Sequence, residues 1–385
     1  MARVELPGGV PAWCATGQEV IKRLLTDPRV SKDAYRHWPA WIDGRVTPQW
    51  SLAIWVSVQN MFTSYGEEHA RLRKPVTREF TARRVSALMP RVERITETLL
   101  DRLEELSAGG GVVDLRTEFA EPLPHRVVCE LFGIPERYQD ELHEIVKGFF
   151  RTGASMAEAQ ANAQALYATM TDFVSFKRRS PGDDLTGSLM TAFAEGATPL
   201  SEKEVIDNLI MLFTAGYEPT VNLLDNAVTA LLTHPEQLDL IRSGRAGWDD
   251  AVEETLRAEA PGAVSLLRYA LEDIPVGDTV IPRGDAIVVS FAAAGRDPEV
   301  HGEDADRFDV TRPGRRGHLS FGYGVHHCPG APLARRTAAT VLPALFARFP
   351  DLALAEPAAR LRPLGSFIAN GHRELPVVLG KRAEG

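Results

Sequence analysis

The sequence has little of what marks a membrane, secreted or nucleic-acid-binding protein. It contains no apolar run of about 18 residues, as a spanning helix requires, and its first residues lack the apolar core of a signal peptide. Only three cysteines occur, Cys14, Cys129 and Cys328, and an odd number at wide spacing is not a disulfide framework. The 52 acidic residues outnumber the 43 basic ones, so the net charge of −9 gives no bulk attraction for nucleic acid or anionic lipid. We therefore expect a cytoplasmic protein that binds neither nucleic acid nor membrane.

Internal repeats and low-complexity linkers are also missing, so the chain of 385 residues is predicted to form one domain, residues 1–385. What is present is mainly helical periodicity with a few short strand-like runs. Helices are predicted at 67–89, 91–106, 158–180, 201–233, 248–259 and 332–349. Strands are predicted at 10–15, 265–269, 287–291 and 376–379, with a hairpin at 275–285. The predicted fold class is mainly α with a minor β region.

The longest predicted helix, 201–233, is expected to run through the core. Ser201 and Glu204 form a capping box at its start, and the apolar run that follows is typical of a helix buried on most sides. At about 1.5 Å per residue, this helix is roughly 45–50 Å long. Pro219 lies in its middle and removes one backbone donor, which predicts a kink and an opening of the helix near 215–216.

A glycine-rich loop at 321–330 brings a cysteine to the start of the helix predicted at 332–349. Cys328 there meets unpaired backbone N–H groups and the positive end of the helix dipole, which stabilise a thiolate and lower the thiol pKa. Glycines in the same loop have no Cβ and allow a large flat ligand to approach the backbone closely. Taken alone, Cys328 also fits a buried structural thiol beside a turn.

This loop resembles the haem loop of the cytochromes P450, Phe-x-x-Gly-x-x-x-Cys-x-Gly, which Phe321, Gly324, Cys328 and Gly330 fill without a gap. The resemblance covers nearly the whole chain. It implies a cytochrome P450 fold, a single large domain with a long central helix across the haem. It also implies heme b as the cofactor and Cys328 as the ligand of its iron, where a thiolate favours O–O cleavage. The expected function is that of a haem-thiolate monooxygenase.

Further residues match haem-binding positions of the family. His69 and Arg73 are four residues apart on one predicted helix, Arg268 follows a strand-like run, and His326 lies two residues before the cysteine. The resemblance implies that these four side chains bind the haem propionates, and His318 is a further candidate. The other residues expected to contact the haem are Ala215, Phe321, Gly322 and Gly330.

An ion pair is predicted near the cysteine loop. Glu254 and Arg257 are three residues apart, so they share one face of the helix at 248–259. In the family this pair is buried and joined by a later arginine that precedes Phe, a place that Arg307 fits. Because buried charges need a satisfied network, we expect these three residues to be structural and to fix the loop.

The long helix departs from the family pattern at one position. Ala215, Gly216 and Glu218 match the pattern Ala/Gly-Gly-x-acid-Thr, but Pro219 stands where the family has a threonine whose hydroxyl helps to relay protons. Thr220 is displaced by about 100° around the helix axis. We predict catalytic roles for Glu218, acting through water, and for Thr220 if the kink turns its hydroxyl back. The alternative for Glu218 is a buried acid paired with a basic residue.

Family position also places the substrate pocket. Its walls are mostly apolar or aromatic, which predicts a largely apolar small-molecule substrate. The residues expected to line it are Trp55, Met211, Gly216, Leu267 and Ile368.

The resemblance to soluble bacterial members implies O₂ and electrons from NAD(P)H, delivered by ferredoxin reductase and ferredoxin. It implies bacterial natural-product biosynthesis, by hydroxylation or by oxidative C–C or C–N coupling. Basic residues expected on the cysteine side suit an acidic partner; they are Arg71, Lys74, Arg83, Arg84, Arg335 and Arg336. Two alternatives remain open. One is a peroxide-dependent haem-thiolate enzyme, since some relatives also carry proline in this helix, although they have a basic residue at the position of Glu218. The other is a haem-binding sensor without catalysis.

Overall fold

In the computed structural model, the chain is mainly helical, as predicted. The structure describes all residues except 108–109, 150–153, 195–199 and 381–385. Its α-helices are α1 (Gln18–Thr26), α2 (Ala34–His37), α3 (Pro39–Ile42), α4 (Ile54–Ser57), α5 (Gly66–Glu79), α6 (Ala82–Ser107), α7 (Pro122–Phe132), α8 (Glu136–Phe149), α9 (Met156–Arg179), α10 (Leu185–Ala194), α11 (Glu202–Thr233), α12 (Pro235–Arg242), α13 (Trp248–Ala258), α14 (Phe291–Gly295), α15 (Pro298–His301) and α16 (Ala331–Arg348). Shorter helical turns are η1 (Arg116–Ala120), η2 (Arg315–Gly317), η3 (Gly324–His326) and η4 (Ala358–Arg360).

The strands of the described residues are short and form three small sheets. They are β1 (Ala2–Leu6), β2 (Val10–Ala15), β3 (Val30–Ser31), β4 (Val113–Asp114), β5 (Arg268–Ala270), β6 (Ile274–Val276), β7 (Thr279–Ile281), β8 (Ala286–Val289), β9 (Ala353–Leu354) and β10 (Pro376–Val378). The largest sheet has the order β1-β2-β8-β5-β3, in which β2 and β8 are parallel and pair Trp13 with Ile287. A second sheet has the order β4-β10-β9, and β6 and β7 form the predicted hairpin.

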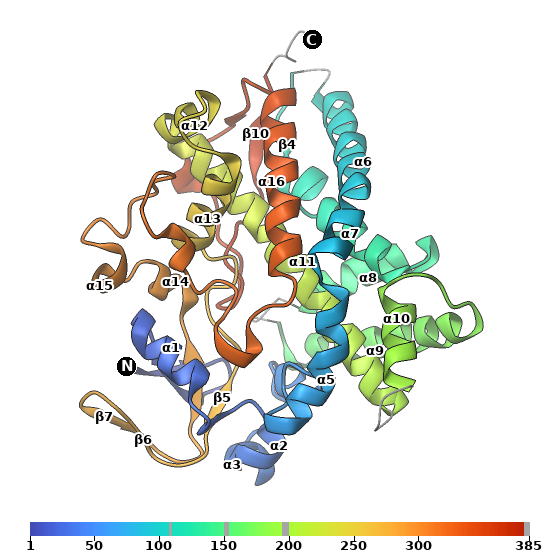
Figure 1. Cartoon of the computed structure of the whole chain (residues 1–385), viewed down its shortest axis with the longest axis vertical. Helices are drawn as coiled ribbons and strands as arrows, with labels where there is room; N and C mark the ends of the chain where they lie inside the picture. The colour runs from blue at the N-terminus through green and yellow to red at the C-terminus, as the bar shows by residue number, and fades with distance from the viewer. Residues whose placement is uncertain (108–109, 150–153, 195–199, 381–385) are drawn as a thin grey trace.

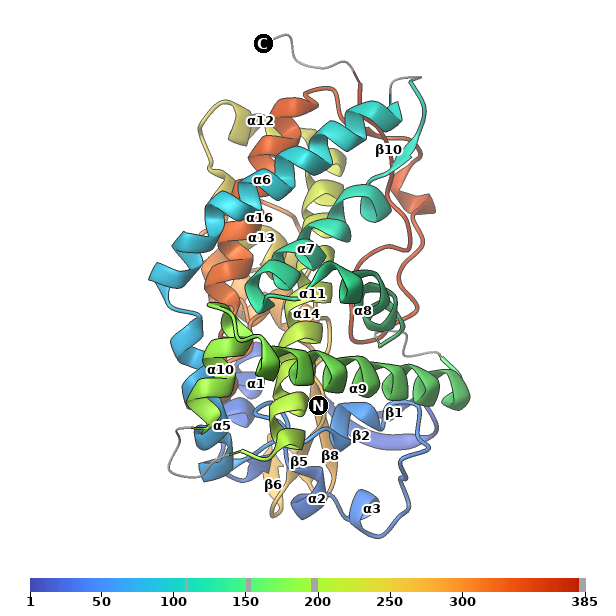
Figure 2. The same cartoon turned by 90° about the vertical axis from the view of Figure 1, so that its right-hand side faces the viewer.

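Helix α11 runs through the middle of the molecule, behind α16 and α6 in Figure 1. Ser201 and Glu204 form the predicted capping box, in which the Ser201 hydroxyl accepts from the Glu204 backbone N–H at 3.3 Å. Most of the helix is buried, and its apolar side chains belong to the largest hydrophobic core. Figure 2 shows α9 crossing α11, and the two helices contact each other.

The predicted opening of α11 is wrong. The helix is uninterrupted from Glu202 to Thr233, with Pro219 inside it. Proline removes only one N–H from a helix of this length, and burial on most sides holds the remaining turns in place.

The helix predicted at 67–89 is in fact two helices. Helix α5 ends at Glu79 and α6 begins at Ala82, and α6 then continues through Pro90 to Ser107. The corner between them brings Phe80 against the cysteine loop, 4.0 Å from the position that a Cβ on Gly330 would take. Short helices that the periodicity did not predict include α1, α7, α8, α10 and α12. Within the described residues, no helix has both the length and the apolar character to cross a membrane.

Candidate active site

A cavity of about 340 Å³ lies between α11 and the cysteine loop, and its wall is mainly apolar. It collects residues from distant parts of the chain, including the segment before α5, helices α7 and α11, strand β5 and the loop before α16. The predicted residues that line it are Trp55, Arg73, Met211, Ala215, Gly216, Thr220, Arg268, Phe321, Gly322, His326, Cys328, Gly330 and Ile368. The cysteine loop and the long helix therefore face each other across one space, as the sequence predicted.

Cys328 lies on the wall of this cavity, just before α16. Its backbone N–H donates to the Phe321 carbonyl at 2.8 Å, which closes the loop. Gly324 has φ of 71° and a missing Cβ that would lie 3.0 Å from the Leu25 carbonyl oxygen, so the turn accepts no larger residue without strain.

The predicted lowering of the Cys328 pKa is wrong. Burial raises the pKa of this thiol above its usual value and outweighs the backbone N–H groups of Gly330 and Ala331 and the charge of Arg73, which act in the opposite direction. The helix start is present, but desolvation of the sulfur is the larger effect.

Two arginines without acidic partners lie at one end of the cavity. Arg73, from α5, and Arg268, from β5, both line the wall beside His326. Among the described residues, no carboxylate oxygen comes within 4.0 Å of either guanidinium, which instead donate to the backbone carbonyls of His327 and Leu266. Arg268 is only 6% exposed, and burial lowers its pKa to about 10. A buried cation without a counter-charge is unfavourable, so this end of the cavity is suited to an anion.

His69 adds an unpaired ring nitrogen at the same end. Its ring packs against His326 with centroids 4.0 Å apart, the side chain is buried, and Nε2 has no hydrogen-bond partner among the described residues. Burial, followed by the charges of Arg73 and Lys32, lowers the pKa of His69 to about 4. Buried polar atoms are rarely left unpaired in native proteins, so a missing hydrogen-bond partner is expected here.

These features fit a haem. Its two propionates would supply the carboxylates that Arg73, Arg268 and His69 lack, and its iron would bond the Cys328 sulfur on the cavity wall. Gly330 leaves the space beside that sulfur free, because a Cβ at this position would lie 3.7 Å from Sγ.

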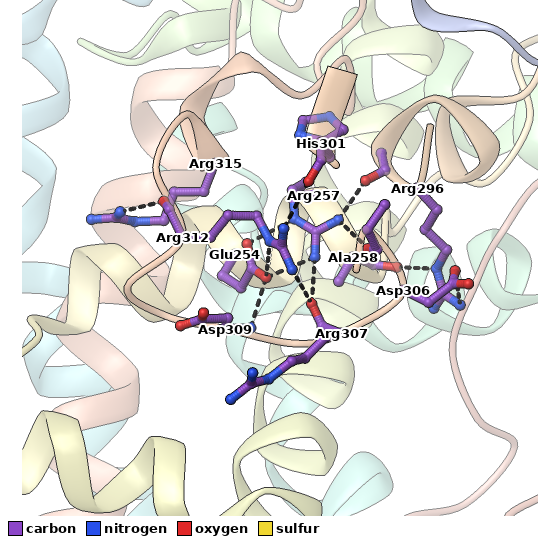
Figure 3. Close-up of polar contacts among 12 residues, drawn as sticks. Glu254, Arg257, Ala258, Arg296, His301, Asp306, Arg307, Asp309, Arg312 and Arg315 are labelled. Carbon is purple, nitrogen blue, oxygen red and sulfur yellow. Dashed lines mark hydrogen bonds and ion pairs between the residues drawn. The ribbon is translucent and has the colours of Figure 1, made fainter. Parts of the chain in front are cut away.

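A second set of buried charges, in contrast, has counter-charges within the protein (Figure 3). Glu254 and Arg257 in α13 are both completely buried and form a bidentate pair at 2.7 and 2.8 Å. Arg257 also donates to the carbonyls of Gly295 at 2.5 Å, Ala305 at 2.7 Å and Arg307 at 2.9 Å. This network ties α13 to the chain that leads into the cysteine loop.

The predicted third member of the network is wrong. Arg307 contributes only its backbone carbonyl, and its exposed side chain points away from the pair in Figure 3. Arg312 takes the place instead, with Nε 3.5 Å from Glu254 and hydrogen bonds of 2.8 Å to Asp304 and to the His301 carbonyl. The turn at 309–312 directs Arg312 inward, because Asp309 donates its backbone N–H to Glu254.

His318 does not reach the cavity either. Its Nε2 lies 3.0 Å from Glu253 of α13, and its Nδ1 accepts from the Ser320 backbone N–H at 3.2 Å. Glu253 also accepts two bonds from Arg335 of α16, at 2.5 and 3.2 Å. His318 therefore fastens the cysteine loop to α13 and α16, and its assignment as a propionate ligand is corrected.

Comparisons with known proteins agree with this geometry. A sequence model of the family described as cytochrome P450 matches residues 248–355. The 2-hydroxy-5-methyl-1-naphthoate 7-hydroxylase of Streptomyces carzinostaticus is 42% identical over 383 residues, which cover 100% of this chain and 93% of that enzyme. The 6-deoxyerythronolide B hydroxylase of Saccharopolyspora erythraea is 38% identical, covering 96% and 91% of the two chains. The structure of CYP154A1 from Streptomyces coelicolor A3(2) matches with a TM-score of 0.92 at 48% identity, covering 98% and 94%.

The chain belongs to the cytochrome P450 family. The predicted family, fold class and enzyme class are therefore confirmed. Cytochromes P450 are haem-iron monooxygenases, and the bacterial members receive electrons from separate redox partners. The relatives include hydroxylases of bacterial natural-product biosynthesis, which is the setting that the sequence predicted.

In this cytochrome P450, Glu218 does not line the cavity. It is buried in α11 and forms an ion pair of 3.2 Å with Arg116 of η1. Burial raises the pKa of Glu218, and the Arg116 charge acts against that rise. Arg116 also pairs with Glu121 at 3.3 Å and Asp225 at 2.9 Å. This position favours the alternative of a paired structural acid, and the predicted role of Glu218 in proton delivery through water stays a prediction.

Two further predictions concern the cavity wall. Thr220 lines the cavity, but its hydroxyl donates to the Gly216 carbonyl at 3.3 Å within the helix. Leu267 is turned away from the cavity and packs with Trp38 and Tyr269 in a separate core, so its pocket assignment is wrong. Its neighbours Ser265 and Leu266 line the cavity instead.

Sequence reasoning missed three charged residues at these sites. Arg116 and Arg312 complete buried networks, and Lys32 is a buried amine without a hydrogen-bond partner among the described residues. A single sequence gives no periodic signal for a residue whose partners lie on other elements. The family pattern of an arginine before Phe selected Arg307, five residues from the side chain that the network uses.

Proposed function

We propose that this cytochrome P450 binds heme b and oxidises a neutral, largely apolar small molecule of bacterial secondary metabolism. The observation that carries the substrate class is the charge distribution in the cavity. Among the described lining residues, only Arg73 and Arg268 bear a fixed charge, and no Asp or Glu is present. Both arginines lie at the end where the propionates would bind, so the remaining wall offers no ionic anchor to a substrate.

Three polar side chains elsewhere on the wall, Ser265, Thr214 and Asn60, are already engaged. Ser265 donates its hydroxyl to the Leu266 carbonyl at 3.0 Å, and Thr214 donates to the Ile210 carbonyl at 2.8 Å. Asn60 accepts from two backbone N–H groups and donates to the Asp207 carbonyl at 3.3 Å. A charged substrate group placed here would lose its hydration without gaining a partner.

The proposed roles of the site residues follow from their positions. Cys328 would ligate the iron, and Arg73, Arg268, His69 and His326 would hold the propionates. The bound haem supplies the activation of O₂, and the apolar wall excludes water from the reacting substrate. Pro219 offers no hydroxyl and Thr220 holds its own within the helix, so we assign proton delivery to no side chain of α11.

We also propose that a ferredoxin docks on the cysteine side. Lys74, Arg83 and Arg336 are exposed there, on α5, α6 and α16. Three other basic residues predicted for this surface are engaged in ion pairs: Arg71 with Glu68 and Glu204, Arg84 with Glu79, and Arg335 with Glu253. The exposed three suit an acidic partner.

The substrate class is tested by titrating the ferric enzyme with matched pairs and following the shift of the Soret band. One pair is a naphthoate, the compound class in the name of one relative, and its methyl ester. We expect the neutral ester to bind roughly tenfold or more tightly than the carboxylate, because the carboxylate would be buried unpaired. Equal or tighter binding of the carboxylate would contradict the proposal.

The haem-thiolate assignment is tested separately with Cys328→Ala. The reduced carbon-monoxide complex of the wild type should absorb at about 450 nm, and the variant should lose this band. Turnover should require ferredoxin, ferredoxin reductase and NAD(P)H. Turnover with peroxide alone would identify the peroxide-dependent alternative, and a ligand-responsive haem without turnover under either condition would identify a sensor.

A further inference from the structure

We propose that Lys32 is an additional cationic ligand of a haem propionate, supplied from the loop between β3 and α2. This proposal rests on the proposed binding of heme b. The residue lies outside every motif by which the sequence resembles its family, and it is far in sequence from His69, Arg268 and His326.

The first observation is a buried amine that lacks an acceptor. Lys32 is 4% exposed, and its Nζ has no hydrogen-bond partner among the described residues. An ammonium group has three N–H donors, and burying it unpaired is strongly unfavourable. The adjacent acid does not compensate it, because Asp33 accepts from the Arg36 backbone N–H at the start of α2. No described carboxylate oxygen lies within 4.0 Å of Nζ.

The second observation is what the amine does contact. Nζ lies 3.0 Å from the centroid of the Phe62 ring, and Phe62 itself lines the cavity. A cation–π contact stabilises a desolvated ammonium group, but the ring face covers only one side of it. The remaining N–H donors still need acceptors. Lys32 itself does not line the cavity, but the contact places its amine directly against a residue that does.

The third observation is that Lys32 interacts electrostatically with the basic groups at the propionate end. Burial lowers the pKa of Lys32 well below its usual value, and the charge of Arg268 adds to this effect. The charge of Lys32 in turn contributes, after the larger effect of burial, to lowering the pKa of His69 and of His326. Lys32 therefore belongs to the cluster at the propionate end. Lys32, Arg73 and Arg268 are three cations without an acid, and a haem brings two carboxylates with several acceptor positions each.

The alternative role is structural, with Lys32 serving only to pack on Phe62. It differs from the proposal in one respect: a structural lysine would alter haem retention without touching the propionates. The test therefore needs a direct reading of the propionate groups besides the rate of haem loss.

The experiment uses the purified holoenzyme and three variants. Lys32→Met removes the amine at similar length, Lys32→Arg keeps the charge, and Lys22→Met is the control, because Lys22 makes an ordinary pair with Glu19 at 2.7 Å on α1. Haem loss is followed as transfer to excess apomyoglobin, and the propionate bending bands are recorded by resonance Raman spectroscopy.

We expect Lys32→Met to lose haem roughly 10- to 100-fold faster, the range that corresponds to one hydrogen bond to a charged group. Its propionate bending band should shift, Lys32→Arg should restore both properties in large part, and Lys22→Met should match the wild type. Should Lys32→Met yield no holoenzyme, Lys32→Gln, which keeps a donor without the charge, should show the shifted band.

Two results would overturn the proposal. One is haem loss from Lys32→Met within about twofold of the wild type, below the effect of a single hydrogen bond. The other is faster loss with an unshifted propionate band, which would assign Lys32 to the packing of Phe62. Failure of the proposed cofactor would look different, because the wild-type protein would then hold no haem.

Discussion

Buried charges are handled in opposite ways in two regions of this cytochrome P450. Around Glu254 and Arg257, each charge has a counter-charge or several carbonyls, with the pair itself at 2.7 Å. At the propionate end, Lys32 and His69 have unpaired nitrogen atoms, and Arg268 has one long bond of 3.4 Å to a carbonyl. In the first region every charged group meets an opposite charge, although Arg312 Nε has no hydrogen-bond partner among the described residues. In the second region, the basic groups have no described carboxylate within 4.0 Å. Buried cations without a counter-charge therefore mark a binding site, whereas paired ones mark a network that stabilises the fold.

The largest expected effect comes from breaking the paired region. Arg257→Ala leaves Glu254 buried without its bidentate partner, which costs about 3–5 kcal/mol of folding stability. We expect little or no haem-loaded protein, measured by the Soret absorbance per protein and by circular dichroism. Arg307→Ala is the matched control, because its side chain is exposed, and it should change stability by less than about 0.5 kcal/mol. A folded, fully loaded Arg257→Ala protein would show that the network is not needed.

A second prediction concerns how the folding stability contributed by the paired acid Glu253 depends on pH. Burial alone would raise the pKa of Glu253, but hydrogen bonds from His318 and Arg335 lower it from 4.5 to about 2. A lowered folded-state pKa stabilises the protein above the unfolded-state value, and this stability is lost as the pH falls toward 2. Glu253→Gln should therefore lower the thermal midpoint most near neutral pH.

The difference between wild type and Glu253→Gln should shrink as the pH falls from about 5 toward 2, measured as thermal unfolding of the ferric enzyme. Glu97→Gln serves as the control, because Glu97 is 57% exposed in its pair with Arg348. A difference that stays constant across this pH range would rule out the carboxylate of Glu253 as its source.

The smallest expected effect concerns Glu218, which, like Glu254, is a buried acid paired with an arginine. Glu218→Gln should keep turnover within a few-fold, because its carboxylate meets Arg116 and does not face the cavity. Arg116→Met should destabilise the protein far more, because it removes the counter-charge that Glu121, Glu218 and Asp225 share. The measurement is product formed per NAD(P)H consumed, together with the thermal midpoint. A loss of roughly 10²–10⁴ in rate for Glu218→Gln would restore its role as a proton donor.

The sequence by itself determined the features that depend on local pattern. The capping box at Ser201, the long apolar helix, strand β2 and the cysteine loop were all predicted near their observed bounds, because each depends on neighbours a few residues away. The haem loop was recognisable for the same reason, since its glycines and Cys328 lie within ten residues of one another.

The tertiary structure alone decided which charges meet. Arg312 rather than Arg307 joins Glu254, His318 pairs with Glu253, and Glu218 pairs with Arg116, which lies 102 residues away. The direction of Leu267 and the burial of Lys32 depend in the same way on elements distant in the chain. Desolvation is also a tertiary property, and for that reason the pKa of Cys328 rises although its place at a helix start favours the thiolate.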